Sequence, residues 1–514
     1  MKKIILTSIT IAALVVSSCH KDLDQLPLST TTADNFFAST VDFEQALVGV
    51  YSTAFHGTYG DNYGYPNRVL NLSETRSDNL YAITSASRDW EGINNFFSSI
   101  TVNGLVEEAY IVNYNSIYKA NLLLQKIDEK ADEFFNDPAD IDQMIAETRF
   151  LRAFCYFDLV RYFGRVPLID APISPQEAAN VGQASVTELY NFIIADLEAA
   201  IDVLEPVEDN NGRVNQYWAK SLLGLVYMTR SSPDYGRNGE LPGLGTNDWQ
   251  AAYDALEDVY LSGAYAFEDS IENIYNYEGA ANTENIIFIP YADINEGVGG
   301  SWISTVTSDQ YFSYLGMNSS QGGIEERPVS NTFADSFDPA DKRYQFGIID
   351  TFTVADDGDR YAGYFSPDPI MIKFADPTRY GSGRTDWGVD FPVIRFTDVM
   401  MMMAECQLRG ASGSLVVDDV INDVRERAGL ARDAAGSTLD DLFEERRKEF
   451  FNEGKRWFDL YRSGDAITTM EQWRADNDQE NRVNDIKVGY LIYPIPQREF
   501  NTAPGLYTQN RDYN

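Results

Sequence analysis

The sequence is poor in the residues on which most catalytic centres depend. It holds two histidines and three cysteines in 514 residues. A Ser-His-Asp or Cys-His device would have to rest on His56 alone, because His20 lies beside the N-terminal apolar run. A zinc cluster of His and Cys ligands is supplied equally poorly, and we expect neither a metal ion nor a cofactor. Two-carboxylate glycoside hydrolysis remains open, since 79 acidic residues can provide a pair.

Basic residues are also scarce, with 40 lysines and arginines and a formal net charge of −39. Such a surface repels phosphate backbones, so we expect no nucleic-acid partner and no adhesion to anionic lipid through basic patches. The acidity does not indicate disorder, because hydrophobic residues make up 44% of the chain and aromatic residues 13%. A chain of this length and composition can bury a large core.

Apolar runs of membrane-spanning length are missing. Near the start, Lys2 and Lys3 precede the mostly apolar Ile4–Val16. As a helix this run would be about 20 Å long, too short for a hydrocarbon core of about 30 Å. The pattern is typical of a signal peptide, which we assign to residues 1–18.

The cysteine that follows has a specific setting. Val16, Ser17 and Ser18 are small or short and precede Cys19, an arrangement that resembles the bacterial lipobox. The resemblance implies that Cys19 is acylated and begins the mature chain, with residues 19–40 as a lipidated tether. Each acyl methylene buried in a membrane contributes roughly 0.8 kcal/mol, so such chains would anchor the protein. The alternative is an ordinary secretory signal cut near Ser18, with Cys19 a stray thiol.

Most of the remaining chain shows helical periodicity. Apolar residues recur with the 3.6-residue spacing of a helix in "VDFEQALVGVYSTAF", "GLVEEAYIVNYNSIYKANLLLQKIDE" and "IDQMIAETRFLRAFCYFDLVRYFGRVPL". Cys155 and Cys406 lie inside such patterns, which favours buried free thiols over a disulfide. The pattern predicts a mainly α fold, an α-solenoid of tetratricopeptide-like helical pairs, although no strict repeat of about 34 residues is present.

We expect residues 41–514 to form a single domain with three parts. Residues 41–272 are predicted to be a helical scaffold. Residues 273–395 change to short β-like runs such as "ENIIFIPY" and to long stretches rich in Gly, Tyr, Ser and Asp, and residues 396–514 return to helices that end in an extended tail. Because loops on a rigid scaffold commonly carry recognition, the loop-rich middle part is predicted to bind ligand.

Seven segments, taken in order, resemble those of the SusD/RagB family of outer-membrane nutrient-binding lipoproteins. They are "CHKDLDQLP", "AETRFLRAFCYFDLVRYFGRVPLI", "YWAKSLLGLVYMTRSS", "FPVIRFTDVMMMMAECQLRG", "INDVRERAGL", "EERRKEFFNEGKRWFDLYRSGD" and "LIYPIPQREFNTAPGLYTQN". The resemblance runs from Cys19 to the C-terminus and implies a lipid-anchored protein at the surface of a Gram-negative outer membrane. It further implies that the protein binds oligosaccharides or polysaccharides and delivers them, as a hinged lid, to a SusC-like TonB-dependent β-barrel transporter. Asp22 and Asp24 resemble the family's surface-export signal.

Two other functions stay open beside this one. The RagB side of the family implies an oligopeptide binder. A surface glycoside hydrolase would need two carboxylates about 5–9 Å apart, but no acidic pair singles itself out and the family is not enzymatic, so we expect no enzyme. Glu449, Glu453 and Arg456 are better explained as a salt-bridged helix junction, and the run Met400–Met403 as core packing.

The candidate ligand contacts centre on tryptophans outside the helical patterns. A sugar ring offers a C–H face to an aromatic platform and hydroxyl groups to polar side chains. Trp90 in "SRDWEGINN", Trp302 in "GGSWIST" and Trp387 in "RTDWGVDF" have polar or Gly-rich neighbours. The predicted glycan contacts are Trp90, Trp302, Trp387, Arg76, Asp78, Asn94, Asn95, Tyr311 and Tyr314. The resemblance supports them by region only, and the alternative is that each aromatic side chain pins a loop to the scaffold.

Overall fold

The structure is a computed structural model of the chain. It describes residues 36–57, 64–81, 88–206, 212–275, 282–291, 299–317, 327–354, 363–365, 368–376, 378–381 and 386–513. The predicted signal peptide, and Cys19 within the predicted tether, lie outside the described residues.

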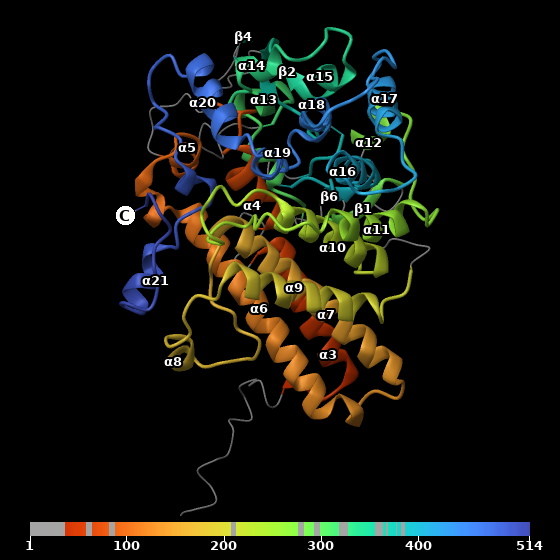
Figure 1. The fold of residues 1–514 in the computed structure, drawn as a ribbon, viewed down its shortest axis with the longest axis vertical. Helices are drawn as coiled ribbons and strands as arrows, with labels where there is room; N and C mark the ends of the chain where they lie inside the picture. The colour runs from red at the N-terminus through yellow and green to blue at the C-terminus, as the bar shows by residue number, and fades with distance from the viewer. Residues whose placement is uncertain are drawn as a thin grey trace, which may run out of the picture.

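A succession of long helices, each packed on the next, forms the scaffold (Figure 1). These helices are α3 (Thr40–His56), α6 (Gly104–Lys130), α7 (Pro138–Phe163), α9 (Val186–Ile201), α10 (Gln216–Ser231), α11 (Trp249–Tyr260) and α16 (Phe396–Leu408). Short helices connect them: α4 (Tyr65–Val69), the π-helix η2 (Leu70–Glu74), α5 (Asp89–Asn94), the 3-10 helices η3 (Ser98–Val102) and η4 (Ala131–Glu133), and α8 (Pro175–Ala178). The predicted helical-pair solenoid is confirmed.

Local sequence explains where these helices begin and end. Asn103 caps α6, since its side-chain oxygen accepts hydrogen bonds from the second and third backbone N–H groups of the helix. Ser185 and Glu188 form a capping box at the start of α9. The last turn of α7 stops at Gly164, whose φ of 67° lies in the left-handed region that favours glycine.

The C-terminal part returns to helix, as predicted. Its helices are α17 (Val417–Arg427), α18 (Leu439–Phe450), α19 (Arg456–Ser463), α20 (Ala466–Asn477), the 3-10 helix η8 (Val488–Leu491) and α21 (Gln497–Thr502). The predicted salt-bridged junction after α18 is confirmed, because Glu449 pairs with Arg395 at 2.9 Å and Glu453 with Lys373 at 2.8 Å, all four side chains being buried. The four methionines Met400–Met403 are buried in α16, and Cys406 is a free buried thiol.

The middle part combines small sheets with short helices. The strands pair antiparallel as β1 (Asn285–Ile289) with β6 (Phe391–Arg395), β2 (Ile348–Ile349) with β5 (Ile370–Met371), and β3 (Phe352–Val354) with β4 (Gly363–Phe365). The helices here are α12 (Ile271–Tyr275), the 3-10 helix η6 (Trp302–Thr305), α13 (Asp309–Tyr314), α14 (Asn331–Ala334) and α15 (Lys342–Gly347). Together they cover one end of the helical scaffold (Figure 1).

One cluster of buried apolar side chains extends from Phe37 to Tyr513, and a small second cluster lies around Phe352. The three parts of the chain thus share one core. Within the described ranges, no helix combines the length and the apolar character needed to span a membrane.

Candidate functional site

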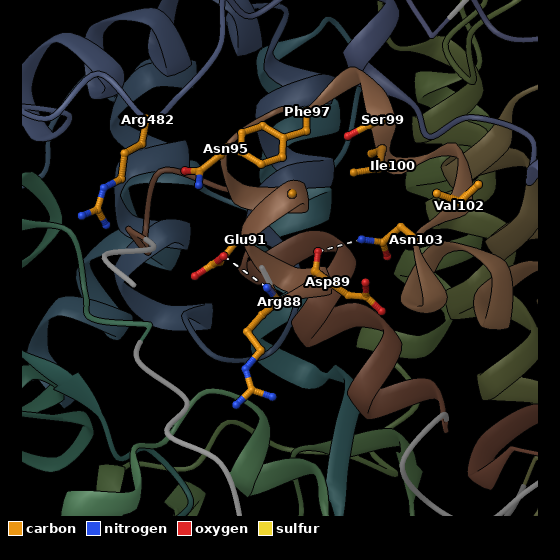
Figure 2. Close-up of a pocket in the computed structure, with 11 residues that line it drawn as sticks. Arg88, Asp89, Glu91, Asn95, Phe97, Ser99, Ile100, Val102, Asn103 and Arg482 are labelled. Atoms are coloured by element: carbon orange, nitrogen blue, oxygen red, sulfur yellow. Dashed lines mark hydrogen bonds between the residues drawn. The ribbon is translucent and has the colours of Figure 1, made fainter. Parts of the chain in front are cut away.

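A pocket of about 530 Å³ opens between α5, η3 and the segment that follows α20 (Figure 2). Its lining residues are Arg88, Asp89, Glu91, Gly92, Asn95, Phe97, Ser99, Ile100, Val102, Asn103 and Arg482. The lining combines charged side chains, amides and an aromatic ring, the mixture that orients a polar organic ligand.

The polar walls of the pocket are held by local backbone contacts. Asp89 Oδ2 accepts a hydrogen bond from the Gly104 N–H at 3.1 Å, and Glu91 Oε2 accepts one from the Arg88 N–H at 3.2 Å. Asn103 Nδ2 donates to the Asp89 carbonyl oxygen at 2.7 Å. These bonds fix the start of α5 against the start of α6, so the wall is formed before any ligand enters.

Asn95 and Phe97 contribute an amide and an aromatic ring to one wall of the pocket. Asn95 is only 3% exposed, and its Oδ1 has no hydrogen-bond partner among the described residues. A buried amide oxygen without a partner costs free energy, which a ligand donor recovers if the amide turns this covered oxygen toward the pocket. Phe97 is 37% exposed and lies beside Asn95 on the same wall (Figure 2). An aromatic ring and an amide side by side can receive the apolar face and a hydroxyl group of one ligand.

Asn95 is the one predicted contact that lines this pocket. Other lining residues, chiefly Phe97, Arg88 and Arg482, are not among the predicted contacts, because those predictions centred on tryptophans. In the sequence, Asn95 and Asn103 flank the short segment that carries Phe97, and this pair of amides was the available sign of the pocket.

The structure corrects the assignment of Trp302 and Trp387. Both side chains are fully buried. Trp302 Nε1 donates to the Val389 carbonyl oxygen at 3.2 Å, and its ring lies edge-on to Phe391. Neither ring presents a face to solvent, so we do not propose either as a sugar platform.

The glycines near these tryptophans allow close packing, and they do not mark an exposed loop. A Cβ added at Gly300 would lie 2.7 Å from Trp302 Cδ1, and one added at Gly299 would lie 2.6 Å from the Trp387 backbone nitrogen. Only glycine fits at these two positions, because the Trp302 indole approaches Gly300 and the Trp387 backbone approaches Gly299 too closely for a Cβ atom.

Arg76, Asp78 and Asn94 are also buried, and their contacts are with other parts of the protein. Asn94 Nδ2 donates to the Thr75 carbonyl oxygen at 2.7 Å. Asp78 pairs with arginines of the C-terminal helices, and Arg76 donates to backbone carbonyl groups. As direct glycan contacts these three predictions are corrected, because the side chains are at most 2% exposed and none of them lines the pocket.

The remaining predicted aromatics have different surroundings. Trp90 is 3% exposed and its ring packs under the Arg327 guanidinium, whose carbon lies 4.7 Å from the ring centroid. Tyr311 is buried, which raises the pKa of its hydroxyl to about 12. Tyr314 is 46% exposed, and the centroid of its ring lies 5.5 Å from that of the Phe352 ring. Neither tyrosine lines the pocket between α5 and η3.

Candidate metal ligands do not gather in the described part of the chain, where no group of three His, Cys, Asp or Glu side chains is placed to hold an ion.

Two family models match the chain and together cover most of it. The model described as "SusD family" matches residues 349–513, and the model described as "Starch-binding associating with outer membrane" matches residues 23–228. The chain belongs to the SusD family. The second matched range contains the whole of α5 and η3, and the first contains Arg482.

Similar SusD-family proteins match along nearly the full length. SusD-like protein P25 of Formosa agariphila is 24% identical, with 95% of both chains covered. Starch-binding protein SusD of Bacteroides thetaiotaomicron is 22% identical, with 97% of this chain and 96% of the relative covered.

Solved structures share the fold. A laminarin-binding SusD-like protein superposes with a TM-score of 0.71 at 25% identity, over 92% of this chain and 99% of that one. Surface glycan-binding protein A of Bacteroides thetaiotaomicron, in complex with laminarihexaose, superposes with a TM-score of 0.75 at 21% identity, with the same coverage.

Proposed function

We propose that this SusD-family protein binds an oligosaccharide or polysaccharide in the pocket between α5 and η3. The observation that carries the proposal is Asn95, a buried amide whose side-chain oxygen lacks a partner among the described residues and which lies beside the exposed ring of Phe97. A sugar hydroxyl group can donate to the amide oxygen once the Asn95 side chain turns that oxygen toward the pocket, while the C–H face of the sugar covers the Phe97 ring. Arg88 and Arg482 on the same walls can donate to further hydroxyl groups.

The protein delivers its ligand, in this proposal, as a lid to a SusC-like TonB-dependent transporter in the outer membrane. Acylated Cys19 would hold it at the cell surface. The match to a family described as "Starch-binding associating with outer membrane" supports the placement at that membrane.

The proposed role includes no catalysis. Asp89 and Glu91 are the carboxylates of the pocket, and each accepts a backbone N–H that fixes the start of a helix. Such bonds explain both acids as structural groups. Turnover of any bound glycan during incubation with the purified protein would contradict this part of the proposal.

Binding can be tested on the protein from Asp22 onward by titration calorimetry. The panel contains laminarihexaose, a starch-derived oligosaccharide, a uronate-containing oligosaccharide and an oligopeptide. We expect one of the neutral glycans to bind, and Asn95→Ala to weaken that binding about tenfold, the effect of one buried hydrogen bond. Asn180→Ala, which removes an exposed amide near α8, serves as the control and should leave affinity unchanged.

Two results would contradict the assignment. Binding of the peptide alone would favour the RagB-like alternative. Equal affinity of the wild-type and Asn95→Ala proteins would remove the pocket between α5 and η3 from consideration.

A further inference from the structure

The chain turns sharply at Phe96, between α5 and η3. Phe96 has a φ of 55°, in the left-handed region that a residue with a bulky side chain rarely adopts. Its ring is fully buried, whereas its neighbours Asn95 and Phe97 both line the pocket. The unfavourable backbone conformation thus separates one buried side chain from two that face the ligand site, and surrounding contacts must maintain it.

Arg76 lies directly beneath this turn. Its guanidinium carbon is 3.9 Å from the centroid of the Phe96 ring, and its Nη1 donates to the Ile93 carbonyl oxygen at 2.7 Å. Its Nη2 donates to the Tyr490 carbonyl oxygen at 2.9 Å, which ties the turn to the C-terminal segment. Arg76 forms no ion pair with any described carboxylate, unlike the buried Arg343, whose Nη2 lies 2.7 Å from Asp341. The contacts of Arg76 are thus directed at the turn and its supports.

Asn484 holds the same turn from the other side. Its backbone N–H donates to the Asn95 carbonyl oxygen at 3.0 Å, and its Nδ2 donates to the Phe96 carbonyl oxygen at 3.2 Å. The segment that carries Asn484 is itself fixed, because Asp478 accepts the backbone N–H groups of Arg482 and Val483 at 2.8 Å. Neither Arg76 nor Asn484 lines the pocket.

We infer that Arg76 and Asn484 are positioning residues, which hold Phe96 in its left-handed conformation and so keep the Asn95 amide and the Phe97 ring directed at one ligand. This inference rests on the proposed glycan-binding function. Loss of either support should let the turn relax toward a commoner conformation, and a displaced pair of contacts would bind less tightly even in a fully folded protein.

The first test uses Asn484→Ala, because Asn484 is an exposed residue and its loss should leave the fold intact. Hydrogen–deuterium exchange reports the turn without any ligand. The amides of Asn95 and Phe97, which donate to Glu91 and Gly92, should exchange about fivefold faster in the variant, while the amides of α7 exchange as in the wild type. Affinity for the panel glycan that the wild type binds, laminarihexaose or the starch-derived oligosaccharide, should fall about fivefold with a nearly unchanged Tm.

The second test compares Arg76→Lys with Arg343→Lys. Both remove a fully buried guanidinium, but Arg343 lies in α15 and pairs with acids. We expect both variants to lose Tm and only Arg76→Lys to lose affinity, since lysine keeps the charge but not the planar set of donors. A purely structural role for Arg76 predicts equal affinities at a temperature where both proteins are folded.

The outcomes separate the two proposals. If the wild type binds no member of the glycan panel, the proposed function fails, and with it the ligand role of the turn. If the wild type binds but Asn484→Ala and Arg76→Lys change neither the exchange of residues 95–97 nor the affinity, the positioning role is overturned alone. Equal loss of affinity in Arg343→Lys would also overturn the positioning role, since a general loss of stability would then explain the weaker binding.

Discussion

Arg456 holds Asp78 in a two-point ion pair between positions 378 residues apart in the sequence. Nε donates to Oδ1 at 2.8 Å and Nη2 to Oδ2 at 2.9 Å. Arg447 adds a third contact to Oδ2 at 2.9 Å, and all three side chains are buried. The segment before α5 is thereby fixed to the junction of α18 and α19, so the wall of the candidate site depends on two segments far apart in the sequence.

Asp78→Asn should therefore destabilise the protein strongly. The substitution leaves two buried guanidinium groups without their carboxylate, a loss of about 3–5 kcal/mol in the free energy of unfolding. Denaturant titration measures it, and Asp258→Asn, in an exposed pair with Lys220, is the matched control with an expected loss of at most about 1 kcal/mol. Equal effects of the two substitutions would contradict the structural role of Asp78.

The same ion pair predicts loss of stability in acid. Burial opposes ionisation of Asp78, but Arg447 and Arg456 outweigh it and hold its pKa at about 2, against 3.8 ordinarily. The same holds for Glu449. Burial raises the pKa of its carboxyl group, but Arg427 and Arg395 lower it more, so that the pKa is about 2 instead of 4.5. Because the folded pKa values are depressed, the stability that they contribute is complete above pH 4.5 and is lost as the pH falls toward 2.

Acid unfolding of Asp78→Asn provides the check. The variant lacks the contribution of Asp78, so its free energy of unfolding should fall less steeply than that of the wild type below the ordinary pKa of 3.8. Parallel curves would show that Asp78 does not titrate with a depressed pKa.

Trp302→Ala should affect stability first. The indole is fully buried against Phe374 and Phe391, and its removal leaves a cavity that costs about 3–5 kcal/mol. Chemical denaturation should show this loss, whereas Tyr118→Ala, at a 50% exposed position on α6, should change stability by less than about 0.5 kcal/mol. A Trp302→Ala protein of wild-type stability would contradict the burial of this ring.

Phe97→Ala should affect binding and leave the fold intact. Phe97 is 37% exposed at the pocket, and an aromatic contact contributes about 0.5–1.5 kcal/mol, so the Kd for the bound glycan should rise about two- to tenfold. Tyr118→Ala again serves as the control, as an exposed aromatic residue away from the site. Unchanged affinity of Phe97→Ala would remove this ring as a platform.

Tyr314 is proposed as a second platform for longer ligands. Its exposed ring is backed by Tyr311 and Phe352, which limit its motion. Since Tyr314 does not line the pocket, Tyr314→Ala should weaken binding of the polysaccharide form of the glycan that the panel identifies more than binding of its oligosaccharide. Titration of both ligands measures the difference, and equal affinities in variant and wild type would contradict it.

Cys19→Ala should leave the protein without its predicted lipid anchor. Membrane fractionation and surface labelling of intact cells should then find it detached from the outer membrane. Cys155→Ala removes a buried free thiol of α7 and is the control that should remain anchored. Retained surface labelling of Cys19→Ala would refute the lipoprotein assignment.

Local sequence patterns were sufficient for the helical scaffold. The 3.6-residue periodicity of "IDQMIAETRFLRAFCYFDLVRYFGRVPL" predicts α7, because this signal acts within a few residues. The cluster at Glu449 and Glu453 was also interpretable, since acidic and basic residues alternate closely in "EERRKEFFNEGKR" and buried charges need partners.

The candidate site was predicted only in part. Asn95 was identified, but Phe97 was not, and the two adjacent phenylalanines illustrate why. Phe96 is fully buried and Phe97 is 37% exposed, although they share the same local sequence. The difference arises from the left-handed turn at Phe96, which Arg76 and Asn484 support from distant parts of the chain.

The sequence by itself determined the helical scaffold and the family of this protein, because periodicity, caps and ordered motifs are recorded along the chain. Only the tertiary structure decided which aromatic and charged side chains reach solvent. Trp302 and Asp78 are covered by segments far away in sequence, at Phe391 and Arg456. Burial depends on which surfaces meet in space, and the residues next to a tryptophan in the chain do not record that meeting.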